Sequence, residues 1–228
     1  MSMRTINTLV LIVGVLTLTS CLKDDDTGYT EDNVAAAQFL NAIPGSDGLI
    51  VALDNNQLNN MSYLEYFASG DVLPYRRVFP GNRVFRAFLP ENVNSNIELK
   101  RKDMQFTPGK FYSVFLAGVS EEDFEIFHVE DSVQAPVEGK AYLRFIHLEA
   151  EGETLDFGVE GSATPLAGNV NYKSFSDFME IDGDEDYTFY VRNADGSGET
   201  HSFTVEIENK DIYTVWVNGP LSHGVIKH

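Results

Sequence analysis

The residues that could bind a metal or activate a nucleophile show no recognised spacing in this chain of 228 residues. Five histidines are spread along it: His128, His147, His201, His223 and His228. No two of them form an H-x-x-x-H or H-E-x-x-H pair, the spacing that places two zinc ligands on one helix face. No serine lies in a G-x-S-x-G elbow, the setting of a hydrolase nucleophile. The sequence therefore predicts no catalytic residue, no cofactor and no metal site.

One run of carboxylates has the alternation of a calcium loop. Asp182, Asp184 and Asp186 stand at every second position, as the first ligands of an EF-hand loop do. The pattern then fails, because Tyr187 occupies the position of the sharp-turn glycine and Asn193 that of the bidentate glutamate. We interpret this run as a solvated turn.

The single cysteine, Cys21, follows a short apolar segment. Arg4 supplies a positive start, and an apolar stretch runs from Leu9 to Leu18. These are parts of a secretory signal peptide, and the stretch is shorter than the roughly 20 residues of a membrane-spanning helix. Leu18-Thr19-Ser20-Cys21 resembles the lipobox of bacterial lipoproteins. That resemblance implies a signal peptide at residues 1–20 and acylation of Cys21.

A polar and acidic stretch follows the cysteine. We interpret residues 21–34 as the lipidated cysteine and a flexible tether, which reaches about 45 Å when extended. Lys23, Asp24, Asp25 and Asp26 resemble the export signal of lipoproteins in Bacteroidetes-type bacteria, which implies display on the cell surface from the outer membrane. A plain acidic linker, with the protein on the periplasmic face, stays open as the alternative.

The charge of the chain restricts its partners. The formal charge is −19, and loss of Arg4 with the signal peptide makes it −20. An acidic surface repels phosphate backbones, so nucleic acid is excluded as a partner. The membrane is expected as a partner through the N-terminal lipid anchor alone. With its one cysteine acylated, the chain forms no disulfide and depends on apolar cores for stability.

The folded part repeats itself. The segment Phe111–Gly118 returns as Ile212–Gly219, a shift of 101 residues, and Phe39-Leu40-Asn41 returns as Phe145-Ile146-His147, a shift of 106. Two copies of one domain explain both shifts. The segment between them contains Pro and Gly and has no core pattern. We therefore predict a first domain at residues 35–130, a linker at 131–139 and a second domain at 140–228.

Each copy has the pattern of short β-strands. Apolar and polar residues alternate from Leu155 to Val159, and the turn Asn193–Gly198 separates two runs rich in aromatic and β-branched residues, which predicts a hairpin. No stretch keeps helical spacing over three turns. The predicted fold class is all-β: two tandem immunoglobulin-like β-sandwich domains after a lipoprotein signal peptide and a flexible tether.

These motifs resemble a known family. Leu143-Arg144-Phe145-Ile146-His147, Asp182-Gly183 and Tyr213-Thr214-Val215-Trp216-Val217 are similar to the domain of unknown function 4397 (DUF4397), as found on Bacteroidetes-type lipoproteins. The resemblance implies an immunoglobulin-like fold and no particular activity. The first copy has Asn41 where the second has His147, and we interpret His147 as a hydrogen-bonded structural residue.

The sequence leaves several functions open. Our leading hypothesis is a non-catalytic, lipid-anchored module of the cell envelope that binds or presents an unknown protein or glycan ligand. A glycan-binding accessory lipoprotein of a polysaccharide uptake system is the alternative, and a surface filament or adhesion subunit a further one. Trp216 is expected in the core, which leaves Tyr63, Tyr66 and Phe67, in an insertion of the first copy, as candidate ligand contacts. The open alternative is that this cluster caps its own sandwich.

One modification site is also predicted. Asp131-Ser132-Val133 matches the short pattern at which Bacteroidetes-type bacteria attach O-glycans to exported proteins. Ser132 is the candidate acceptor, and a chance match of three residues is the alternative.

Overall fold

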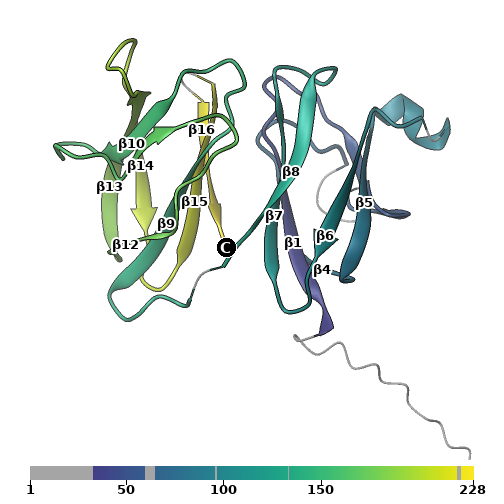
Figure 1. Cartoon of the computed structure of the whole chain (residues 1–228), viewed down its shortest axis with the longest axis horizontal. Helices are drawn as coiled ribbons and strands as arrows, with labels where there is room; N and C mark the ends of the chain where they lie inside the picture. The colour runs from purple at the N-terminus through teal and green to yellow at the C-terminus, as the bar shows by residue number, and fades with distance from the viewer. Residues whose placement is uncertain (1–32, 60–64, 96, 133, 220–221) are drawn as a thin grey trace, which may run out of the picture.

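The predicted all-β fold is confirmed by the computed structural model, which describes residues 33–59, 65–95, 97–132, 134–219 and 222–228. Two β-sandwiches lie side by side (Figure 1). A 3-10 helix, η2, spans Pro90–Ser95. Within the described part of the chain, no helix has the length and apolar character to cross a membrane.

The first sandwich is built from two four-stranded sheets, ordered β4-β1-β7-β8 and β3-β2-β5-β6. Its strands are β1 (Ala35–Asn41), β2 (Ile50–Leu53), β3 (Asn56–Gln57), β4 (Val72–Val78), β5 (Gly81–Phe88), β6 (Lys100–Phe106), β7 (Phe111–Gly118) and β8 (Phe124–Glu130).

The second sandwich repeats this plan, with sheets ordered β12-β9-β15-β16 and β11-β10-β13-β14. Its strands are β9 (Lys140–His147), β10 (Leu155–Val159), β11 (Ala167–Val170), β12 (Met179–Asp182), β13 (Glu185–Asn193), β14 (His201–Ile207), β15 (Ile212–Gly219) and β16 (Ser222–Lys227).

The sequence repeat returns as an identical pairing of strands. In each copy the first and seventh strands run parallel, with Phe39 opposite Val114 in one and Phe145 opposite Val215 in the other. The predicted hairpin is confirmed as β13 paired with β14. Its turn contains Gly196 and Gly198 at φ of 78° and 74°, a backbone region that glycine enters without steric cost.

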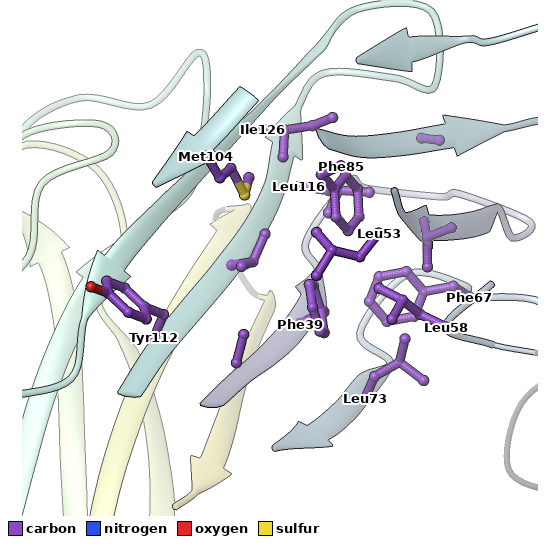
Figure 2. Close-up of a cluster of buried hydrophobic side chains, with 14 of the residues drawn as sticks. Phe39, Leu53, Leu58, Phe67, Leu73, Phe85, Met104, Tyr112, Leu116 and Ile126 are labelled. Atoms are coloured by element: carbon purple, nitrogen blue, oxygen red, sulfur yellow. The ribbon is translucent and has the colours of Figure 1, made fainter. Parts of the chain in front are cut away.

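Each sandwich has its own apolar core between its two sheets. Figure 2 shows the first core, in which Phe39 and Phe85 stack with ring centroids 5.6 Å apart. In the second core Phe157 stacks on both Phe145 and Phe189. These rings occupy the apolar positions of the alternating pattern from which the strands were predicted.

A third apolar cluster joins the two sandwiches. It contains Leu40 and Phe115 from the first and Ile146 and Trp216 from the second, all at most 4% exposed. Trp216 is buried, as expected, but it lies between the sandwiches rather than inside its own. Leu40 corresponds to Ile146 and Phe115 to Trp216 in the repeat, so each copy presents the same sheet face to the other. The result is four stacked sheet layers (Figure 1).

Candidate functional site

A buried ion pair crosses between the sandwiches beside this apolar cluster. The Arg144 Nη2 on β9 donates to Asp131 Oδ1 at 2.7 Å, and the two side chains are 2% and 3% exposed. Asp131 follows β8 directly and is the first residue of the predicted linker, in which no apolar pattern of a core strand was found. Its other oxygen, Oδ2, accepts hydrogen bonds from Tyr75 at 2.6 Å and Ser113 at 2.8 Å. The linker therefore begins with a fixed residue.

His228 completes this network from the end of the chain, which Figure 1 places between the two sandwiches. Its Nδ1 lies 2.8 Å from the Tyr75 hydroxyl and 3.1 Å from Gln38 Nε2, and its Nε2 lies 2.7 Å from Thr214 Oγ1. Burial lowers the pKa of His228 to about 4, against a smaller raising effect of Asp131. Burial and the carboxylate of Asp131 also raise the pKa of Tyr75.

The polar network follows the repeat as closely as the apolar cluster does. Gln38 corresponds to Arg144 and Ser113 to Thr214, by the same shifts of 106 and 101 residues, and each pair hydrogen-bonds across its parallel strands. Of these positions only Arg144, in the second copy, is charged. The single carboxylate of Asp131 balances its charge.

A hollow of about 450 Å³ opens beside Arg144, and we call it the junction pocket. Its lining combines three aromatic rings with hydrogen-bonding side chains from the linker, β9 and the loop before β12: Glu130, Ser132, Gln134, Tyr142, Arg144, Phe175, Ser176, Asp177 and Phe178. Phe175 is 46% exposed, which is unusual for a phenylalanine. Aromatic rings and polar groups therefore meet on one concave surface.

The aromatic wall of the junction pocket is held in place by the strand beneath it. Ile146 and Phe175 form a β-bridge, and the Ser176 hydroxyl accepts a hydrogen bond from the Phe145 backbone N–H at 3.0 Å. The Arg144 guanidinium lies 4.6 Å from the Phe178 ring centroid and 5.9 Å from that of Phe175. These cation–π contacts fix the rings over a buried charge.

Of the three candidate ligand contacts of the first copy, the structure describes two, and they differ in exposure. The expectation for Phe67 was wrong: its ring is fully buried in the first core, because its backbone pairs with Leu49 and turns the side chain inward (Figure 2). Tyr66, one residue earlier, is 44% exposed and lines a separate hollow of about 470 Å³ with acidic neighbours. Tyr63 lies outside the described residues.

The lipidation and export residues Cys21, Lys23, Asp24, Asp25 and Asp26 also lie outside the described residues. Ser132 is described and exposed, and its hydroxyl donates to the carboxylate of Glu130. It borders the junction pocket. O-glycosylation of Ser132 stays a prediction.

The histidines occupy separate environments. His147 is fully buried, and its Nδ1 lies 2.9 Å from the carbonyl oxygen of Val170. Burial lowers the pKa of His147 and of His128, which packs on Phe106 and Tyr112. His201 and His223 form a pair, while His228 belongs to the network above.

The carboxylates of the acidic turn point to different partners. Asp182 Oδ1 lies 2.6 Å from Lys140 Nζ, and Asp184 Oδ1 accepts from the Asn209 backbone N–H at 3.1 Å. Among the described residues, no group of three or more His, Cys, Asp or Glu side chains is placed to hold one metal ion.

The residues of the junction pocket were not found from the sequence. Tyr142 and Arg144 sit on a strand whose alternation was recognised, but Phe175 and Phe178 belong to an irregular loop that no periodicity marks. The available signal was two phenylalanines three residues apart in the mostly polar stretch Asn171–Phe178.

Comparison with known proteins gives one sequence family. The profile described as "Domain of unknown function (DUF4397)" matches residues 35–158. No curated protein matches the chain.

Solved structures share the β architecture at low similarity. The family 26 carbohydrate-binding module of Amy13K from Eubacterium rectale, solved with maltoheptaose, is 8% identical, with 86% of this chain and 97% of that chain covered and a TM-score of 0.28. A structure described as alpha-glucan binding by a streptococcal virulence factor is 10% identical, with coverage of 81% and 93% and a TM-score of 0.26. A putative cell adhesion protein from Bacteroides ovatus is 13% identical, with coverage of 86% and 95% and a TM-score of 0.20. At these values the likenesses carry no argument about function.

Proposed function

Because the chain belongs to the DUF4397 family, whose description assigns no activity, we propose a function from its own residues: a non-catalytic, lipid-anchored envelope protein that binds a neutral glycan in the junction pocket. The observation that carries this proposal is the exposed ring of Phe175 beside half-buried Phe178 and Tyr142 in a preformed hollow. The C–H faces of a pyranose ring pack on such aromatic surfaces, because both sides are apolar and flat.

Polar side chains around these rings supply the groups that hold sugar hydroxyls. Gln134 offers an amide and Asp177 a carboxylate, both exposed at the rim. A ligand site usually combines apolar surface with a few placed polar groups that fix the orientation of the ligand, and the junction pocket offers both. The volume of about 450 Å³ lies within the range typical of such sites.

The charge of the protein favours an uncharged ligand. A chain of −19 repels polyanions such as nucleic acids and acidic polysaccharides. The one strong cation at the pocket, Arg144, is neutralised by Asp131 behind it. A neutral glycan meets no repulsion and needs no counter-charge.

A binding role without catalysis is supported by the state of Glu130. Glycoside hydrolysis needs a carboxyl group with a raised pKa as the proton donor. The hydrogen bond from Lys110 lowers the pKa of Glu130, and a second from Ser132 acts in the same direction. Glu130 is thereby held ionised, as a hydrogen-bond acceptor.

The proposed location rests on the sequence. Cys21 and the tether would hold the two sandwiches to the outer membrane, and Lys23–Asp26 would direct them to the cell surface. A tether of about 45 Å leaves the junction pocket free to reach glycans beyond the lipid headgroups.

Glycan-array binding by the purified full chain tests the proposal. We expect binding to neutral oligosaccharides, with the affinity reduced at least tenfold by Phe175→Ala. Phe79→Ala is the matched control, because Phe79 is a comparably exposed phenylalanine at 54% that lies in the first sandwich. Tyr66→Ala tests the second hollow in the same assay. If Tyr66→Ala weakens binding and Phe175→Ala does not, the glycan binds in the hollow beside Tyr66 rather than in the junction pocket. If the parent protein binds no glycan, the proposed function is wrong.

A further inference from the structure

Two histidines meet at the open edge of the second sandwich. His201 lies on β14 and His223 on β16, which are the edge strands of its two sheets. His201 Nε2 lies 2.9 Å from His223 Nδ1. The pair therefore bridges the sheets where the sandwich is not closed by backbone pairing.

The separation of the two nitrogens suits one metal ion. Imidazole nitrogens bind first-row transition ions at about 2.0–2.1 Å, so two cis ligands of a tetragonal site stand about 2.9 Å apart, and those of a tetrahedral site about 3.4 Å. The observed 2.9 Å matches the tetragonal value, the geometry that Cu²⁺ prefers. In the metal-free protein this contact is a hydrogen bond, and an ion would replace its proton once the two rings turn so that both lone pairs meet at the ion.

The surroundings keep these rings ordered and available. The Phe203 ring stacks on His223 with centroids 3.9 Å apart and an interplanar angle of 15°. Burial lowers the pKa of His223, and the neighbouring His201 adds to this. Neutral imidazole is the form that binds a metal, because the ion takes the place of a proton.

An acidic hollow adjoins the pair. Its volume is about 370 Å³, and its lining contains His201, four glutamates and one cation, Arg192. The glutamates are Glu149, Glu151, Glu153 and Glu199. A concave surface with this excess of carboxylates raises the local concentration of cations.

We propose that His201 and His223 bind a divalent transition-metal ion, with Cu²⁺ held more tightly than Ni²⁺ or Zn²⁺. The two imidazoles are the protein ligands, and water completes the coordination, since the described residues place no third His, Cys, Asp or Glu ligand there. The order of affinities follows the general stability series of these ions on nitrogen ligands. Mg²⁺ and Ca²⁺ prefer oxygen ligands and are excluded.

The site belongs to the second copy alone. By the pairing of the strands, His201 corresponds to Lys100 on β6 and His223 to Ile126 on β8. Neither residue is a metal ligand at neutral pH. One ion per chain is therefore expected, and its binding does not depend on the glycan function.

Titration of the full chain, purified without a histidine tag, with Cu²⁺ tests this site. We expect one ion per chain, electron paramagnetic resonance showing two coordinated nitrogens, and at least a tenfold loss of affinity in His201→Gln and in His223→Gln. His128→Gln is the matched control, because His128 contacts Phe106 and Tyr112 rather than a second imidazole. It should bind copper as the parent does.

Three results would overturn the proposal. They are unchanged copper binding by the His201→Gln/His223→Gln double variant, equal binding of Mg²⁺ and Cu²⁺, and a parent spectrum without nitrogen coupling. The last measurement needs no variant, so it decides the matter even if a substitution prevents folding.

Discussion

The carboxylate of Asp131 and the guanidinium of Arg144 form an ion pair buried between the two sandwiches, 2.7 Å apart and with each side chain at most 3% exposed. Asp131 stands one residue after β8 and Arg144 on β9, so the pair ties the start of the linker to the second sandwich. Asp131 also accepts hydrogen bonds from Tyr75 and Ser113 of the first sandwich, so the pair connects the two sandwiches. The junction pocket depends on this geometry.

Removing one partner of this pair should be costly. We expect Asp131→Ala to lower the free energy of unfolding by about 3–5 kcal/mol, because it leaves Arg144 buried without its counter-ion. Chemical denaturation measures the change. The double variant Asp131→Ala/Arg144→Met should lose less than Asp131→Ala alone. The control is Asp182→Ala, which removes an exposed partner of Lys140 and should change the stability little. Equal losses for Asp131→Ala and Asp182→Ala would contradict the buried pair.

Stability should fall in mild acid because of His228. Burial holds its folded pKa at about 4, below the ordinary 6.5, so the unfolded chain binds the proton more readily between these values. The stability that neutral His228 contributes is complete above about pH 6.5 and is lost as pH falls toward 4, by on the order of 3 kcal/mol. Unfolding measured at several pH values should show a steeper fall for the parent than for His228→Gln. Parallel curves would show that His228 does not titrate in this way.

The apolar contact between the sandwiches should couple their unfolding. Trp216→Ala removes a nearly buried indole from this cluster, at an expected cost of about 3–5 kcal/mol. Calorimetry should then resolve two transitions where the parent shows one, since each sandwich keeps its own core. Leu166→Ala, at a residue 37% exposed, is the control and should change little. A single, unshifted transition in Trp216→Ala would disprove the coupling.

Gly224 leaves the space in which the Trp216 ring lies. The two residues are opposite each other in the β15–β16 ladder, and a Cβ added at Gly224 would come 2.3 Å from Trp216 Cζ2. We expect Gly224→Ala to destabilise the protein by about 1–3 kcal/mol and to shift the fluorescence of its one tryptophan. Gly168→Ala is the matched strand control, with its closest new contact at 3.4 Å. An unchanged emission spectrum in Gly224→Ala would show that the ring is not displaced.

Membrane attachment should depend on Cys21. We expect Cys21→Ala to release the protein from the membrane fraction, because several acyl chains are what hold such a protein there. Cell fractionation followed by immunoblotting measures this. Replacing Lys23–Asp26 by alanine should leave the protein in the membrane fraction but shield it from protease added to whole cells. A Cys21→Ala protein that stays with the membrane would refute the anchor, and unchanged proteolysis of the alanine variant would favour a plain linker.

The strands, the hairpin and the repeat were predictable, because each depends on local alternation or on direct self-similarity of the sequence. The sheet faces that meet between the sandwiches were harder to predict. One indication is that β7 is buried from Tyr112 to Gly118 without a break, whereas a strand with one face in solvent would alternate. Asp131 gave no such indication. A lone aspartate in a segment with Pro and Gly looks solvated until its partner, 13 residues later, is placed in space.

For a related reason, Phe67 was wrongly chosen as a candidate ligand contact and Phe175 was not recognised as one. Phe67 was a candidate ligand contact because it stands in an insertion, but it forms a β-bridge to Leu49 and its side chain is buried in the core. Phe175 forms a comparable bridge to the buried Ile146, and yet its side chain is 46% exposed. Local composition does not distinguish these two outcomes, since both depend on which strand the loop meets.

The matched faces that join the two copies have a consequence for how this surface can change. In a homodimer with the same interface, any substitution appears on both subunits, so an arginine at the position of Arg144 would face its own copy. Here the equivalent position is Gln38, and the charge is balanced by Asp131, whose own counterpart in the second copy, by the pairing of the strands, is His228. Covalent fusion of the two units has thus released the interface from self-complementarity. Each side can specialise alone, and the copper and glycan sites proposed for the second copy are changes that the first copy need not share.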